Sequence, residues 1–296
     1  MARAVPLPAR AAPVESPLRI AARKFLRHRL ALIGAFVLIV ITILSVFAPF
    51  FAPDNPLAVD VRQFRRPPSP EHLLGTDSAG RDVLSRVIYA GRVSLLVGVA
   101  AALASMSVGL VLGTLAGSIG GRVDTLLMRI TDVFLSFPSL IVIMLVVALA
   151  GQSIWIVILG ISLFEWPIAA RIVRGVALSV REQEFMVAAR VVGVPEWRLI
   201  TRHLVPAVLS PLTVAATVTV ALAIRVEATL SFLGLSVRPP EPTWGNMLNE
   251  AQSLTILESM PWLWLVPGLA IALTVLAVNF VGDGLRDALD PRQRLS

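Results

Sequence analysis

Six stretches of this chain are apolar over close to the roughly twenty residues that a helix needs to cross a bilayer. They cover residues 30–50, 93–119, 134–150, 153–170, 207–224 and 262–281. Charged residues make up 15% of the chain, against about 25% in soluble domains. Inside a bilayer a single apolar segment satisfies its backbone hydrogen bonds only as a helix. The sequence therefore predicts an all-α integral membrane protein with six transmembrane helices.

The basic residues predict how these helices are oriented. If both termini lie on the same side as the loops after the second and fourth spans, eighteen of the 26 basic residues fall on that side. Basic residues are enriched in cytoplasmic loops, so we expect both termini to be cytoplasmic and the protein to lie in a bacterial inner membrane. The net charge of +7 then reflects topology and membrane lipid, and nucleic acid is not expected as a partner.

The same pattern predicts an order of segments along the chain. Residues 1–29 form a cytoplasmic tail, of which 1–20 are expected to be disordered. Residues 30–50 form an uncleaved first span, since about 29 residues precede it and its core is too long for a signal peptide. Residues 51–91 form an extracytoplasmic loop. Residues 92–283 form a five-helix core with a cytoplasmic loop at 176–205, and residues 284–296 form a cytoplasmic tail.

One cytoplasmic stretch, residues 181–209, is unlike the apolar spans on either side. Its first part predicts a helix over 181–192 with an apolar face, and its second part a short helix with another apolar face. Gly193 suits a helix end, and Pro195 suits the first turn of the next helix. The two faces consist of Phe185, Ala188, Ala189 and Val192, and of Trp197, Ile200 and Leu204. From the residues alone, a connector on the membrane surface and a docking surface for a partner are equally plausible.

The stretch resembles the coupling loop of permeases from bacterial importers of the ATP-binding-cassette (ABC) class. Ala188 and Ala189 match the paired alanines of that motif, Gly193 its glycine, and Val205-Pro206 its closing pair. The motif's acidic residue is replaced by Val187, and the acid is Glu184 instead, as in peptide importers. The resemblance implies that the loop docks on an ATPase through Glu184, Ala188, Ala189, Arg190, Gly193, Val194 and Trp197.

Further blocks at 73–95, 120–140, 227–248 and 261–292 resemble the C-type permease subunit of dipeptide and oligopeptide importers. The resemblance implies a type I ABC importer permease fold. It also implies several partners: a homologous second permease, two ABC ATPase subunits that bind ATP and Mg²⁺, an extracytoplasmic substrate-binding protein, and a peptide substrate. Nickel importers share much of the pattern, so a nickel-importer permease remains an alternative.

Several absences limit the chemistry of the chain itself. It has no cysteine and no phosphate-binding G-x-x-x-x-G-K-[ST] motif, so any ATPase must be a separate chain. His28, His72 and His203 lie far apart in the sequence. We therefore expect no catalytic residue, no metal site and no cofactor of its own. A secondary transporter driven by ions is a less favoured reading, because no central carboxylate cluster or inverted repeat is recognisable.

Three features within the spans also carry predictions. Small residues at a spacing of four permit close helix packing, and we expect such packing at Gly109, Gly113, Gly117 and Gly121, although a role in lining the substrate pathway stays possible. We expect Glu165 to be an interfacial charge near the cytoplasmic end of its span rather than a functional group. Arg225 and Glu227 are either an interfacial pair or a contact for an external partner.

Overall fold

The protein is described by a computed structural model over residues 17–238 and 240–289. Within these residues the chain forms helices and no strands. The helices are α1 (Pro17–Phe25), α2 (Arg29–Val46), α3 (Ala48–Phe51), η1 (Val61–Gln63), α4 (Val83–Ile119), α5 (Gly121–Ser136), α6 (Ser139–Ala150), α7 (Ile154–Arg181), α8 (Glu184–Val191), α9 (Glu196–Leu199), η2 (Ile200–Leu204), α10 (Val205–Phe232), α11 (Trp244–Glu250), α12 (Leu254–Ser259) and α13 (Trp262–Leu289).

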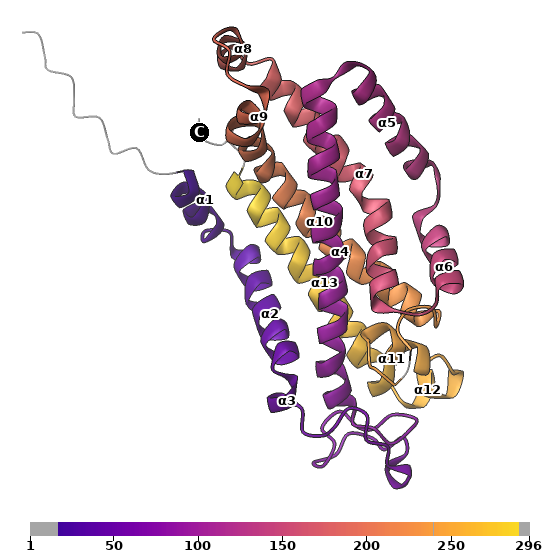
Figure 1. Cartoon of the computed structure of the whole chain (residues 1–296). Helices are drawn as coiled ribbons and strands as arrows, with labels where there is room; N and C mark the ends of the chain where they lie inside the picture. Colours follow the sequence, from indigo (N-terminus) through magenta and orange to yellow (C-terminus); the bar gives the residue numbers. More distant parts are fainter. Residues whose placement is uncertain (1–16, 239, 290–296) are drawn as a thin grey trace, which may run out of the picture.

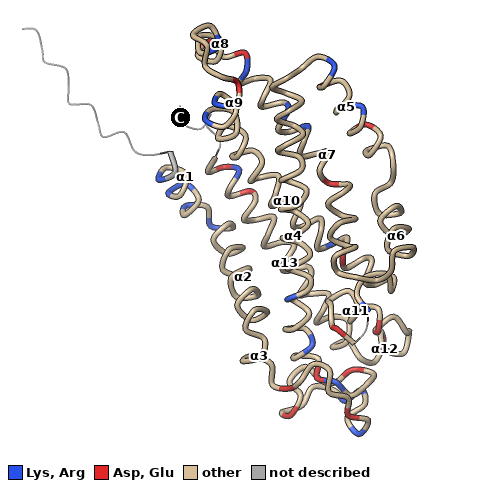
Figure 2. The backbone as a smooth tube through the Cα atoms, in the orientation of Figure 1, with Lys and Arg blue, Asp and Glu red and all other residues tan. Residues whose placement is uncertain are grey.

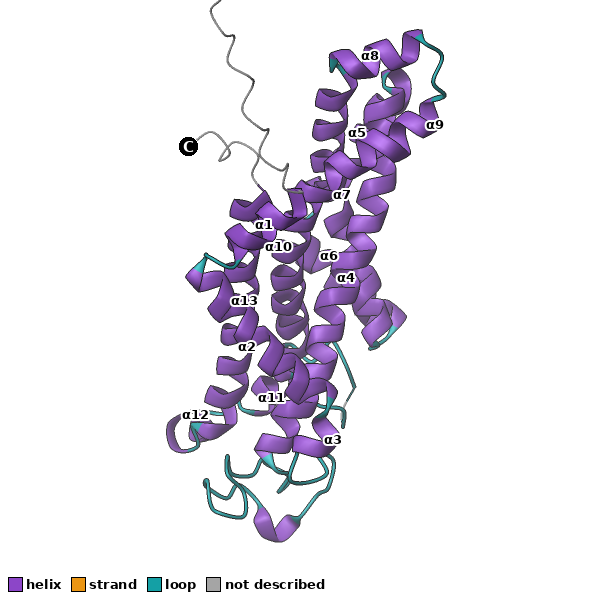
Figure 3. Cartoon of the chain, turned by 90° about the vertical axis from the view of Figure 1, so that its left-hand side faces the viewer, coloured by secondary structure: helices purple, strands orange, loops and turns teal. Residues whose placement is uncertain are grey.

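The long helices stand side by side as an elongated bundle (Figure 1). α1, α8, α9 and the last turn of α13 lie at one end, which we call the α8 end. α3, η1, α11 and α12 lie at the other, which we call the η1 end, as Figure 3 also shows. α4 is the central helix, because it packs against α7, α10, α2 and α13. Buried apolar side chains fill the seams between these helices.

Five helices are long and apolar enough to cross a membrane: α2, α4, α7, the continuous run from α9 to α10, and α13. Most are longer than the apolar runs in the sequence. α4 begins ten residues before its predicted span, and α7 continues to Arg181. Polar ends of these helices extend past the apolar segments, which the hydropathy of the sequence does not reveal. Likewise, α1 begins at Pro17, within the part of the tail expected to be disordered; residues 1–16 and 290–296 lie outside the described residues.

The predicted third span, 134–150, is not one helix. α5 and α6 meet at an 82° bend, at Phe137 and Pro138, whose extended backbone separates the two helices. Proline cannot donate a backbone hydrogen bond, and the residue before it is pushed out of the helical region. The six-span prediction holds if this bent pair crosses as one unit, since the described helices then give six spans.

Charge and hydropathy are separated along the bundle. Most charged residues lie near its two ends, and the middle of the helices is largely free of them (Figure 2). The outward faces of the middle are apolar, as the exposed fractions of Leu145, Leu149, Trp155 and Leu159 show, at 57%, 80%, 65% and 66%. Side chains of this kind would be costly in water over such an area. They identify the band that faces lipid.

α4 and α7 approach closely along the predicted glycine stripe. A Cβ added to Gly109 would lie 2.9 Å from the backbone nitrogen of Ala170, and one added to Gly113 would lie 2.5 Å from the carbonyl oxygen of Ala170. Gly117 faces Ala177 in the same way. Backbone therefore meets backbone here, which is the reason small residues are needed.

The prediction for Gly121 is wrong. α4 has ended at Ile119, and Gly121 begins α5 with a φ of +57°. A Cβ on Gly121 would meet nothing within 4 Å. The residue serves the turn between two helices rather than a helix contact, and only three of the four glycines lie on the α4–α7 seam.

We expect Gly113→Leu to separate α4 from α7, because its side chain has to displace backbone and Val173. The thermal stability of the detergent-purified protein, measured by differential scanning fluorimetry, should fall sharply, and the yield of folded protein with it. Gly175→Leu is the matched control, since Gly175 lies in α7 with nothing within 4 Å of an added Cβ. Equal stability of the two variants would contradict a tight contact at Gly113.

Candidate functional site: the α8–α9 loop

The α8–α9 loop, residues 182–204, projects from the α8 end of the bundle (Figures 1 and 3). It joins α7 to the run α9–η2–α10, which is one continuous helical span. The loop therefore stands directly on two spans. Its last residues, 200–204, form a turn of π-helix, a widened turn that occurs often at functional sites.

The turn after α8 depends on Gly193, whose φ is +84°. The Gly193 amide donates to the carbonyl oxygen of Arg190 (2.9 Å), and the Val194 amide donates to that of Ala189 (3.0 Å). These two bonds form a Schellman motif, which ends a helix with a left-handed residue. Ala189 and Val194 also pack in one apolar cluster, as is common in this motif. Glycine is therefore required here for its backbone conformation and not for lack of room, because a Cβ on Gly193 would meet nothing within 4 Å.

Arg190 fastens the two helices of the loop together. Its guanidinium donates to the Glu196 carboxylate at 3.0 and 3.2 Å, and also to the carbonyl oxygen of Arg181 at 3.4 Å. α8 is in this way tied both to the end of α7 and to the start of α9. Phe185 and His203 add a ring contact, with centroids 5.5 Å apart.

The side of α8 that is buried within the chain differs from the apolar face recognised in the sequence. Met186, Leu199 and Val180 are buried and form the contact between the loop and α7, with Ala189 and Val194 at its edge. The contact forms on this side because Val180 and Leu199 are the apolar residues that α8 can reach. The predicted face of α8 is mostly turned outward instead, and only Ala189 of that set lies in the cluster.

An apolar surface is therefore left open on the loop. We call it the outer face; it consists of the exposed residues Phe185, Val187, Ala188, Val191, Val192 and Trp197. Val191 and Val192 are 82% and 83% exposed. Glu184 lies at the first turn of α8 and is also exposed. The sequence-predicted loop residues are hence divided: Arg190, Ala189 and Val194 hold the loop together, and Ala188 and Trp197 face outward.

At the η1 end, a buried charge cluster ties the loop before α4 to α11. The Arg86 guanidinium contacts both Asp77 and Glu250, with 2.8 Å from Nη2 to Glu250 Oε1. Arg81 Nε donates to Asp77 Oδ2 (2.7 Å), and Arg81 Nη2 donates to Glu250 Oε2 (3.0 Å). The two arginines and two acids balance in charge, which a buried cluster requires. Sequence reasoning did not find this cluster, because Glu250 lies more than 160 residues from its other three members.

Glu227 does not pair with Arg225. Residues two positions apart on a helix point in nearly opposite directions. Accordingly, Arg225 is exposed and Glu227 is fully buried. Ser231 and Ser94 donate hydroxyl hydrogen bonds to Glu227 at 2.7 and 3.0 Å. Thr243, which caps α11, donates to Ser231 (3.1 Å). Glu227 thus joins α10 to α4 and to the segment before α11. Of the two alternatives predicted, the interfacial pair is wrong, and a contact with an external partner stays open for the exposed Arg225 alone.

Glu165 lies near the middle of α7 and not near the end predicted to be cytoplasmic, because α7 runs from Ile154 to Arg181. Its side chain is 8% exposed. No described residue forms a hydrogen bond or ion pair with it. The neighbouring Arg171, which the sequence placed beside it, is bonded to Asp132 (2.6 Å) instead. An unpaired acid at this depth is unusual.

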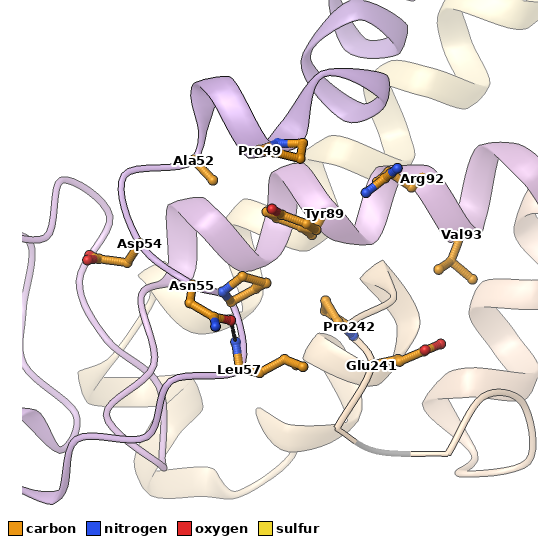
Figure 4. A pocket seen from close by; sticks show the side chains of 11 residues that line it. Pro49, Ala52, Asp54, Asn55, Leu57, Tyr89, Arg92, Val93, Glu241 and Pro242 are labelled. Atoms are coloured by element: carbon orange, nitrogen blue, oxygen red, sulfur yellow. Dashed lines mark hydrogen bonds between the residues drawn. The ribbon is translucent and has the colours of Figure 1, made fainter.

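A pocket near the η1 end has a volume of about 580 Å³. Its walls come from the segment after α3, the first turns of α4 and the segment before α11 (Figure 4). Arg92 and Glu241 supply one charge of each sign, and Tyr89 supplies an aromatic wall. The Asp54 carboxylate belongs to the rim and points away from Tyr89 and Arg92 in Figure 4.

Two regions of the chain match known protein families. Residues 109–295 match the family described as the binding-protein-dependent transport system inner membrane component. Residues 16–68 match the N-terminal transmembrane domain of oligopeptide transport permease C. The first match contains the whole α8–α9 loop and the α4–α7 glycine stripe.

Curated relatives match along nearly the whole chain. A putative peptide permease of Brucella suis is 41% identical over 95% of this chain and 93% of its own length. A putative peptide transport system permease of Brucella abortus is 40% identical, with 95% and 94% covered. The dipeptide transport system permease of Alkalihalophilus pseudofirmus is 38% identical, with 94% and 91% covered.

Among solved structures, an inward-facing MetNI methionine ABC transporter has a chain that superposes with a TM-score of 0.56. The match covers 70% of this chain and 97% of that chain at 16% identity. At this identity the likeness concerns the fold alone. It identifies the bundle as an ABC permease fold.

We expect Gly193→Leu to weaken the turn by about 1–2 kcal/mol, the cost of a left-handed backbone for a residue with a side chain. Hydrogen exchange of the Val194 amide, which bonds to Ala189, should become faster by about tenfold or more. Gly193→Asn is the control, because asparagine tolerates this backbone better, and its exchange should stay closer to wild type. Unchanged exchange in Gly193→Leu would show that the turn does not depend on glycine.

Proposed function

Because this chain belongs to the inner-membrane permease components of binding-protein-dependent transport systems, we propose that it imports dipeptides or oligopeptides in an ATP-driven complex. The chain is a non-catalytic transport subunit, and ATP hydrolysis takes place in other chains. The peptide cargo is supported by the match at residues 16–68 and by relatives described as peptide and dipeptide permeases.

The complex contains three other kinds of protein in this proposal. A homologous second permease completes the translocation pathway, two ATPase subunits bind ATP and Mg²⁺ on the cytoplasmic side, and a substrate-binding protein delivers the peptide from the outside. Both termini and the α8–α9 loop then lie on the cytoplasmic side, and η1 lies outside. The segment boundaries predicted from the sequence, with the permease core at 92–283, remain proposals as well.

The α8–α9 loop is the proposed docking element for an ATPase. Its outer face, which includes Trp197, is apolar and exposed, lies at the end proposed to be cytoplasmic, and has Glu184 beside it. An apolar surface of this kind on a short projecting element is typical of a contact for another protein. Arg190 and the Schellman turn make the loop rigid, so that it moves as one body.

Movement of the loop is transmitted to the membrane spans through two helical connections, which we call arms. One arm is α7, which contacts the loop through Val180 and Met186 and packs on α4 through the glycine stripe. The other arm is the run α9–η2–α10, which is continuous with the loop. Closure of the ATPase dimer on ATP therefore shifts α4, α7 and α10 together. Because ATP binds elsewhere, the coupling is mechanical and depends on two global states that differ in ATP affinity.

The observation that carries the cargo assignment is the pair of matches to peptide permeases at about 40% identity. Uptake of a radiolabelled dipeptide into vesicles containing the full complex tests it, with ATP inside and the binding protein outside. Uptake that needs ATP and survives a proton ionophore agrees with the proposal. Uptake of Ni²⁺ in place of dipeptide would assign the nickel-importer alternative.

We expect Val191→Glu to reduce copurification of the ATPase subunits by about tenfold or more, since it buries an unpaired carboxylate in the contact. Insertion should survive, because Val191 is 82% exposed and outside the spans. Val61→Glu is the matched control at the other end, where Val61 is 80% exposed. Full copurification of the ATPase subunits with Val191→Glu would show that the outer face is not the docking site.

Cysteine labelling tests the orientation without background, since the chain has no cysteine. In intact spheroplasts that make this chain without the ATPase subunits, we expect a membrane-impermeant maleimide to label Val61→Cys and not Val192→Cys. Both positions are at least 80% exposed, and permeabilisation should make Val192→Cys reactive. Labelling of Val192→Cys before permeabilisation would reverse the topology.

A further inference from the structure

Three metal-ligating side chains meet at the η1 end, away from the α8–α9 loop. His72 Nδ1 lies 3.1 Å from Asp82 Oδ1 and 3.7 Å from Asp54 Oδ2. The three donor atoms all lie within 4.8 Å of one another. We propose that Asp54, His72 and Asp82 bind a divalent first-row transition-metal ion such as Zn²⁺, which fastens the segment before α4 to the N-cap residue of α4.

The spacing of the donor atoms suits such an ion. Zinc lies roughly 2.0–2.2 Å from histidine nitrogen and carboxylate oxygen, so donors that share one ion are roughly 3.0–3.5 Å apart. The distance from His72 to Asp82 falls in this range, and the distance from His72 to Asp54 needs only a small rotation of an exposed side chain. A mixed set of imidazole and carboxylate suits zinc and its neighbours, whereas Ca²⁺ and Mg²⁺ take oxygen ligands.

The ligands are held in place by a second set of contacts. The amide of Ser85 donates to Asp82 Oδ2 (2.7 Å), which leaves Oδ1 for the ion. The hydroxyl of Ser85 accepts from the amide of Asp54 (3.0 Å), so one buried serine positions two of the three ligands. Ser69 holds the backbone of His72, since its hydroxyl accepts from the His72 amide (3.1 Å). Partners of this kind are typical around metal ligands.

The electrostatics also favour a cation. Two carboxylates and a neutral imidazole carry a charge of about −2, and Asp82 has no exposed side-chain area. Carboxylates brought this close repel each other unless a cation lies between them. The basic residues of the nearby buried cluster do not serve this purpose, because Arg81 and Arg86 bond to Asp77 and Glu250. A protonated His72 is the competing explanation, and it makes the same contacts without metal.

The inference concerns a different part of the molecule from the proposed docking loop and does not depend on the cargo or on the orientation. Its consequence is structural. The segment from Asp54 to Asp82 has little helix of its own, and a metal ion closes it onto α4. The pocket of Figure 4 shares Asp54 as a rim residue, so the ion also fixes one wall of that pocket.

The test uses the assembled complex, treated with a chelator and then dialysed against Zn²⁺. The zinc content is measured for wild type, Asp54→Asn, His72→Gln and the control Glu71→Gln. Asp54→Asn keeps the size of the side chain and its amide bond to Ser85, and Glu71 is an exposed acid next to His72. We expect Asp54→Asn and His72→Gln each to lose one zinc per copy of this chain relative to wild type and Glu71→Gln.

Two further readouts separate a metal site from a simple ion pair. Zn²⁺ should raise the unfolding temperature of wild type and Glu71→Gln and not that of Asp54→Asn, and Ca²⁺ should raise neither. Co²⁺ should give a visible absorption spectrum that is lost in His72→Gln. Equal zinc content in all four proteins, with no shift of unfolding temperature that depends on Asp54, would overturn the proposal and leave His72 as the cation of an ion pair.

Discussion

The contact of α4 with α7 is the constraint on which the other features depend. Gly109, Gly113 and Gly117 let two backbones meet where side chains would hold them apart, and the lipid supplies no hydrophobic drive to compensate for poor packing. Because α4 also packs on α2, α10 and α13, its position sets theirs. α7 in turn carries the α8–α9 loop on its last turns. A tight α4–α7 pair is therefore both the centre of the fold and the arm through which the proposed docking loop acts on the membrane spans.

Polar groups buried near the η1 end complement this apolar contact. Glu227 links α10 to α4 and to the cap of α11, and Arg86 links the start of α4 to α11. Each has at least one hydrogen-bond partner from a distant part of the chain, so that loss of that partner leaves a buried polar atom without a hydrogen bond. The glycine stripe allows close approach and these networks specify register, since a shift of α4 by one turn would break the bonds to Ser94 and Arg86 together.

The sequence predicted the membrane spans and the Schellman turn well because both are local signals. Apolar runs report bilayer crossing, and Gly193 followed by Val194-Pro195 reports a helix end. The sequence was not informative where the position of a side chain depends on residues far away in the chain. Val180 and Leu199 determine which side of α8 is buried. Ser94 is one of the hydrogen-bond partners that hold Glu227 inside the bundle. The bend at Phe137-Pro138 was not predicted, because the apolar run in the sequence continues across it. The histidines looked isolated in the sequence, and only the fold brings Asp54 and Asp82 to His72.

The two ends of the molecule are built for different mechanical tasks. At the α8 end the loop is rigid within itself, through Arg190 and Gly193, but its outer face is open, which suits an element that must seat on a partner and then move with it. At the η1 end, by contrast, the charged residues are mostly satisfied within the chain, by Arg86, by Glu227 and by the carboxylates around His72. A rocking motion of the spans needs one end that is held and one that is driven. In the proposed coupling mechanism, the η1 end is therefore the end that is held, and the α8 end is the end that the ATPase drives.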